Sequence, residues 1–144
     1  MVDRLIIERL TSLINSYLND LKPVQDVSFS QYSKDIKTQR FVERTLHIAI
    51  EACLDIGNHI ISDEGFREPE DNRDIFNVLG EKGIITDKLQ KRLQDMASFR
   101  NLMVHSYAKI DNEIVYGILK KRLGDIEEFM KVISKPITSR KQRT

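Results

Sequence analysis

Apolar residues along this chain recur mainly at intervals of three and four, which is the spacing of one face of an α-helix. Runs in which apolar and polar residues alternate, as in strands, are few. The first apolar stripe predicts a helix from about Val2 to Lys22, ended by Pro23. Its apolar positions are Leu10, Leu13, Ile14, Tyr17, Leu18 and Leu21. We therefore expect an all-α fold.

The segment from about 38 to 62 is the most hydrophobic of the predicted helices. Apolar residues cover most of its circumference, so it should lie at the centre of the fold. Its remaining polar residues are also three or four positions apart and share one narrow face. They are Arg44, His47, Glu51, Asp55, Asn58 and Ser62. Because unpaired polar groups in an apolar core are costly, this face should line a water-filled cleft or a polar interface.

Capping residues predict the ends of the elements that flank this central helix. A short helical turn should follow Ser28 or Ser30. Gly65 is free to adopt the left-handed conformation that ends many helices. Asp71 or Asn72 should cap a short helix over about 73–81.

Two more long helices complete the predicted fold. Thr86 should cap the first of them. Asp111 should cap the second, whose apolar rhythm continues to Pro136. The prediction is a helical bundle of four long helices plus one short helix. Residues 1–135 should form one domain, and residues 136–144 a basic tail.

Composition narrows the class of protein. A chain of 144 residues with 40% hydrophobic residues should bury roughly two-thirds of its unfolded surface, so it needs no disulfide or metal to fold. Cys53 is the one cysteine, which excludes an internal disulfide and a zinc site built on paired cysteines. No run approaches the roughly 18 apolar residues of a membrane span. We expect a cytoplasmic protein that does not contact a membrane.

The net charge is +1, so the overall charge does not point to a nucleic-acid-binding protein. Basic residues do gather in the last ten residues, an end that is interpreted either as solvated or as an arm that grips RNA. They are Lys135, Arg140, Lys141 and Arg143.

The segment from Ser98 to Tyr107 is the one stretch where a cation, an imidazole and a phenol come close together in sequence. Arg100 and His105 are five positions apart, about 140° around an unbroken helix, so their convergence requires the helix to end or bend between them. In an extended segment His105 and Tyr107 would project to the same side. An alternative is structural, with Arg100 complementing the helix dipole and His105 capping a carbonyl.

The segment FRNLMVHSY closely resembles the signature of HEPN domains, and most of all that of the HepT toxin branch. It contains Arg100, then four residues, His105, one residue and Tyr107. The stretch ERTLHIAIEACLDIGNHII also resembles the central helix of that family. With the helix order, the resemblance covers roughly residues 1 to 135. It implies a metal-independent endoribonuclease, the toxin of a toxin–antitoxin pair, whose antitoxin is a minimal nucleotidyltransferase. It implies no metal and no cofactor.

The residues of the motif suit that chemistry. Cleaving RNA without a metal requires one group to take the 2′-OH proton, one to protonate the 5′ oxygen, and positive charge at the phosphorane. His105 can transfer protons near neutral pH, and Arg100 can hold a phosphate in bidentate fashion. Because one imidazole does not easily perform both transfers, a homodimer that brings two motifs into one cleft is expected.

The resemblance also implies supporting residues. Asp55 and Asn58 are candidates for a supporting polar site, with an internal hydrogen-bond network to Arg44 or Ser62 as the alternative. Tyr107 is expected either to contact substrate or to receive AMP from the nucleotidyltransferase.

Three further residues have structural interpretations, and a second function is an alternative to the ribonuclease. His47 and His59 lack a partner with metal-ligand spacing and are interpreted as structural, and Cys53 as a small core residue. The alternative function is a non-catalytic helical adaptor that binds a nucleotidyltransferase or its nucleotide substrate.

Overall fold

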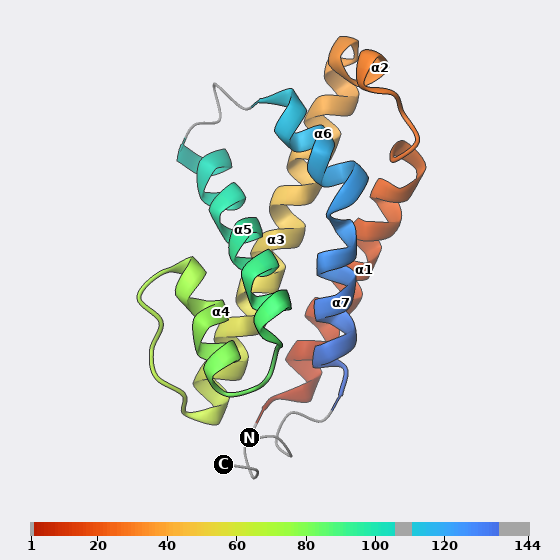
Figure 1. Ribbon diagram of the computed structural model, residues 1–144. Helices are drawn as coiled ribbons and strands as arrows, with labels where there is room; N and C mark the ends of the chain where they lie inside the picture. Colours follow the sequence, from red (N-terminus) through yellow and green to blue (C-terminus); the bar gives the residue numbers. More distant parts are fainter. Residues whose placement is uncertain (1, 106–110, 136–144) are drawn as a thin grey trace.

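The computed structural model describes residues 2–105 and 111–135, and only the backbone of Val104 and His105. Within these ranges the secondary structure is entirely helical, which confirms the all-α prediction. Four rods run alternately up and down the molecule (Figure 1). They are α1 (Arg4–Leu21), α3 (Ile36–Glu64), α5 (Asp87–His105), and α6 (Asn112–Lys121) followed by α7 (Leu123–Ile133). The shorter elements are the 3-10 helix η1 (Lys22–Val24), α2 (Phe29–Lys34) and α4 (Asn72–Glu81).

The longest helix, α3, lies at the centre, as its hydrophobicity predicts. It packs against α1, α2, α4, α5 and α6. Leu46, Ile56 and Ile60 on α3 are completely buried. On the other side of the core, the rings of Phe76 and Phe129 meet edge to face with their centroids 5.8 Å apart, joining α4 to α7. Burial of such side chains is the main source of stability in a bundle of this kind.

The predicted caps are present. Ser28 begins α2 with a capping box that it shares with Gln31. Gly65 ends α3 in the left-handed conformation, with a φ of 69°. Asp71 caps α4 by accepting a hydrogen bond from the backbone of Asp74, and the Thr86 hydroxyl caps α5. These local signals therefore place four helix ends correctly.

The prediction of a single last helix is wrong, because the fourth rod is broken at Arg122. Apolar spacing continues across the break, so periodicity does not reveal it. The Asp125 carboxylate, which is 7% exposed, accepts hydrogen bonds from Arg122 at 2.7 Å and from Arg92 of α5 at 3.0 Å. We call these three residues the α5–α7 clamp, since they fix the start of α7 against α5.

The apolar stripe predicted for α1 also needs one correction. Leu13 is 44% exposed, whereas Ile7 is buried together with Ile14, Leu18 and Leu21. The buried face of α1 therefore differs from the predicted stripe at these two positions, Leu13 and Ile7. α1 packs against α3 and α7, and the position of these two neighbours selects which apolar residues face inward.

Candidate functional site

The polar face of α3 is open, as predicted. Glu51 and His47 on this face are partly exposed, and the residues on either side along it are exposed, while the rest of the helix is largely buried. These exposed residues are Arg44, Asp55, Asn58 and Ser62. Between Val42 and Ile61, where its other residues are largely buried, α3 thus presents one hydrophilic strip to solvent.

Arg100 of α5 reaches this strip and binds Glu51. Its Nε and Nη2 atoms both lie against the Glu51 Oε1 oxygen, forming a short ion pair. The side chains are partly buried, with Arg100 23% and Glu51 35% exposed. Ionic hydrogen bonds in such surroundings are less screened than at a free surface. Arg100 is therefore held in one place.

Two neighbours extend this contact. His47, one helical turn before Glu51, has its Nε2 3.2 Å from the same Oε1 oxygen. On the other side, Nη1 of Arg100 donates to the side-chain oxygen of Asn101 at 3.2 Å. That same oxygen accepts a hydrogen bond of 3.1 Å from Asn72, the first residue of α4. Groups from α3, α4 and α5 therefore meet at Arg100.

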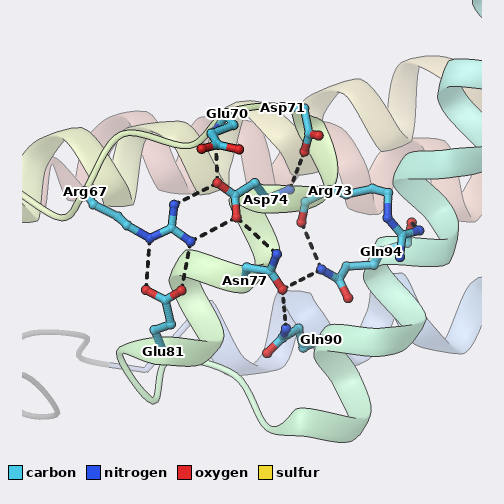
Figure 2. Close-up of polar contacts among 9 residues, drawn as sticks. All are labelled: Arg67, Glu70, Asp71, Arg73, Asp74, Asn77, Glu81, Gln90 and Gln94. Carbon is cyan, nitrogen blue, oxygen red and sulfur yellow. Dashed lines mark hydrogen bonds and ion pairs between the residues drawn. The ribbon is translucent and has the colours of Figure 1, made fainter.

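A polar cluster at the beginning of α4, shown in Figure 2, anchors the segment that precedes the helix. Arg67 binds Asp74 through two hydrogen bonds of 2.7 and 2.9 Å, and it also binds Glu81. The Arg67 guanidinium holds the pKa of the Asp74 carboxyl well below its usual range, helped by the Glu70 backbone and by Asn77. This loop is thus attached to α4 at both ends of the helix.

The same cluster joins α4 to α5. The side-chain oxygen of Asn77 accepts hydrogen bonds of 2.7 Å from both Gln90 and Gln94 of α5 (Figure 2). Gln94 also donates to the backbone oxygen of Arg73. Since Asn72 starts α4, this docking fixes the position from which it reaches Asn101.

α5 continues as a regular helix through His105. The expected end of the helix between Arg100 and His105 is therefore not present. The side chain of His105 and all of Tyr107 lie outside the described residues, so the predicted convergence of the three groups stays a prediction.

Asp55 and Asn58, the predicted supporting residues, are exposed on the same face of α3 as Glu51. The pKa of the Asp55 carboxyl is raised, chiefly by partial burial and further by the charge of Glu51, while His59 lowers it. The structure places Glu51 against Arg100 and gives neither of the two predicted residues such a contact within the described part of the chain. Their supporting role stays a prediction.

Sequence reasoning included Glu51 in the polar face without assigning it a role. Arg100 and Glu51 are 49 positions apart, so no local pattern indicates that they touch. The one available signal is the place of Glu51 on the polar face, a turn before Asp55. His47, interpreted as structural, likewise contacts Glu51 on this face.

Two further properties bear on the chemistry of the chain. Within residues 2–105 and 111–135, no group of three or more His, Cys, Asp or Glu side chains is arranged to hold a metal ion. None of the helices described here is long and apolar enough to cross a lipid bilayer. Cys53 is buried in the core, and burial raises the pKa of its thiol to about 12, so it is a poor nucleophile.

Comparison with known proteins identifies the family of this chain. The sequence model of the ribonuclease HepT-like family matches residues 8–133. The mRNA nuclease HepT of Shewanella oneidensis is 35% identical over 115 residues, which cover 78% of this chain and 86% of that protein. The tRNA nuclease HepT of Aphanizomenon flos-aquae is 32% identical over 133 residues, which cover 92% of this chain and 90% of that protein.

Solved structures similar to this chain support the same family. A crystal structure of the toxin–antitoxin with AMP-PNP contains a chain with a TM-score of 0.83 and 31% identity, covering 90% of this chain and 97% of that chain. The tri-AMPylated Shewanella oneidensis HEPN toxin in complex with MNT antitoxin gives a TM-score of 0.82 at 31% identity, covering 93% of this chain and 98% of that chain. Sequence and fold lead to one assignment: the chain belongs to the ribonuclease HepT-like family of HEPN proteins.

Proposed function

We propose that this chain is an endoribonuclease toxin that cleaves RNA without a metal ion and is neutralised by a nucleotidyltransferase antitoxin. The observation that carries the proposal is the Arg100 guanidinium, held by Glu51 at the open polar face of α3. The family of the chain and its relatives named mRNA nuclease and tRNA nuclease support RNA as the substrate class.

The proposed reaction uses the Arg-x4-His-x-Tyr motif. A base takes the proton of the 2′-OH, the 2′ oxygen attacks the neighbouring phosphorus, and an acid protonates the departing 5′ oxygen. His105 is the proton-transfer group, because an imidazole exchanges protons near neutral pH. Arg100 binds the phosphate and stays positively charged throughout, so it offsets the charge that develops on the phosphorane.

We also propose that the active form is a homodimer, since each motif contributes one imidazole and the reaction has two proton transfers. An exposed apolar groove between α5 and α6, whose lining does not include Arg100, supports such an association. Leu102 of α5 and Ile114 of α6 are 43% and 44% exposed, and both line a groove that also contains Phe99 and Ile118. Exposed apolar groups in a groove favour association with another protein surface.

Three predictions from the sequence remain part of this proposal. Asp55 and Asn58 would border the path of the RNA along the polar face of α3. Tyr107 would either contact the substrate or accept AMP from ATP with release of pyrophosphate. The tri-AMPylated state of the Shewanella oneidensis toxin supports the second role. Residues 1–135 would carry the activity as one domain, with the basic residues 136–144 as a tail.

Cleavage of RNA by the purified chain tests the proposal. In excess chelator the wild-type chain should cut RNA, and Arg100→Ala and His105→Ala should lose the activity while keeping the helical content and melting temperature of the wild type. Cleavage that appears only after adding a divalent metal would contradict the metal-independent mechanism. A chain that never cuts RNA but binds a nucleotidyltransferase would favour the alternative, a non-catalytic adaptor.

A further inference from the structure

The contacts of Arg100 occupy only part of its guanidinium. An arginine has five N–H groups, one on Nε and two on each Nη atom. Glu51 receives one from Nε and one from Nη2, and Asn101 receives one from Nη1. Among residues 2–105 and 111–135, one N–H on Nη1 and one on Nη2 therefore have no acceptor. Two such groups form a fork whose spacing matches two oxygens of a phosphate.

Glu51 is itself held in place from within α3. His47 and Glu51 are four residues apart, so their side chains lie on the same face of the helix. The Oε1 oxygen that binds Arg100 is also 3.2 Å from the Nε2 of His47. Nε2 donates this hydrogen bond in the charged imidazole and in the neutral tautomer that carries the Nε2 hydrogen. His47 is 27% exposed and thus also partly buried.

We infer that His47 and Glu51 are positioning residues for Arg100, and that together they aim its free N–H fork at a phosphate of the substrate. We call the three residues the His47–Glu51–Arg100 chain of contacts. The inference rests on the proposed function, because it names how Arg100 of that site is oriented. It also replaces the purely structural interpretation of His47.

The architecture supports such a role. α3 is packed on several sides, so the backbone under His47 and Glu51 has little freedom to move. Arg100 is also fixed from the opposite side, where Asn72 holds the Asn101 oxygen that accepts from Nη1. A guanidinium that is already oriented loses less conformational freedom when it binds a phosphate.

Steady-state cleavage by Glu51→Gln is the first test. The substitution keeps the size of the side chain but removes its charge and one acceptor oxygen. The fork should then lose its orientation, and kcat should fall by about tenfold to a hundredfold. KM for RNA should stay equal or decrease, because the loss of a negative charge favours binding of a polyanion. Glu8→Gln, which changes an exposed carboxylate on α1, is the matched control and should behave as wild type.

His47→Gln tests the second positioning residue, with His59→Gln as its control, since His59 lies on the same helix and is also partly buried. Residues that act through one contact show non-additive effects. The double variant with Glu51→Gln should therefore cut RNA no more slowly than Glu51→Gln alone. An unchanged kcat in Glu51→Gln, or additive losses in the double variant, would overturn the inference.

A spectroscopic readout keeps this inference separate from the proposed activity. The Nε–H signal of Arg100 in a ¹⁵N-labelled sample should be visible in the wild type, since an N–H bound to a partly buried carboxylate exchanges slowly with water. The signal is assigned to Arg100 if it is absent from the spectrum of Arg100→Lys. Glu51→Gln should broaden or remove it, and Glu8→Gln should not. If Glu51→Gln leaves the signal unchanged, the inference is wrong whether or not the chain cuts RNA.

Discussion

Replacing Gly57 by alanine should destabilise the fold, because Gly57 lies where α3 and α4 approach closely. A Cβ at this position would be 2.5 Å from Cγ2 of Ile75. Carbon atoms in ordinary contact are about 3.5–4.0 Å apart, so one of the two helices must move by about 1 Å. Ile75 is buried, and its branched side chain cannot rotate Cγ2 away without leaving its preferred rotamer.

Two effects of opposite sign decide the magnitude. Alanine is favoured over glycine inside a helix by about 0.8–1.0 kcal/mol. Overpacking a core costs about 1–3 kcal/mol. Since the clash involves a rigid group, we expect a net loss of about 1–2 kcal/mol in the free energy of unfolding. Gly117→Ala on α6 is the control, because no atom lies within 4 Å of its Cβ position. It should be stabilising by up to about 1 kcal/mol.

Urea unfolding followed by far-ultraviolet circular dichroism measures both variants, at one fixed protein concentration because association would shift the midpoint. Gly57→Ala should lower the midpoint and Gly117→Ala should raise it. In a chain that already carries Ile75→Ala, the cost of Gly57→Ala should disappear, since the clashing atom is absent. A Gly57→Ala midpoint that rises like that of Gly117→Ala would refute the proposed close contact.

Three more predictions concern acid stability, assembly and inactivation. The pKa of Asp74 is lowered by its bonds to Arg67, so the stability that this pair contributes is present at neutral pH and is lost as the pH falls below about 4. Asp74→Asn should therefore cost about 1–2 kcal/mol at pH 7, and this cost should shrink progressively as the pH is lowered from about 4 towards 2, because the folded carboxyl stays ionised well below its ordinary pKa; a cost that does not change between pH 7 and pH 2 would contradict it. Light scattering should show a homodimer at micromolar concentration, and a fully active monomer would exclude a shared catalytic site. Incubation with the cognate nucleotidyltransferase and ATP should place AMP on Tyr107, and a Tyr107→Phe variant that is still inactivated by modification would defeat that assignment.

The sequence predicts those parts of the fold that depend on neighbouring residues. Helix caps at Ser28, Asp71 and Thr86 are local hydrogen bonds between a side chain and a nearby backbone, so three or four residues are enough to indicate them. The polar face of α3 is equally predictable, because it needs only the period of one helix. The face of α3 that carries Glu51 can therefore be predicted without any tertiary contact.

Contacts between segments that are far apart in the sequence cannot be predicted from helical periodicity. The pair of Arg100 and Glu51 depends on how α5 lies against α3, and the break at Arg122 depends on groups from α5 and α7. The inward face of α1 likewise follows from its neighbours, which is why Leu13 is exposed and Ile7 buried. Periodicity describes one helix at a time and holds no information on these arrangements.

The α5–α7 clamp restricts how this protein can change during evolution. Asp125 stands between two guanidiniums, those of Arg92 and Arg122. Losing the carboxylate alone would remove the acceptor that the two guanidiniums share and leave each with one acidic partner, Glu128 for Arg92 and Asp95 for Arg122, and losing one arginine alone leaves the carboxylate with a single partner. Breaking a buried pair from one side is more costly than replacing the whole group by apolar residues. Among descendants of this sequence, the three positions should therefore change together, through a short series of substitutions, rather than drift one by one.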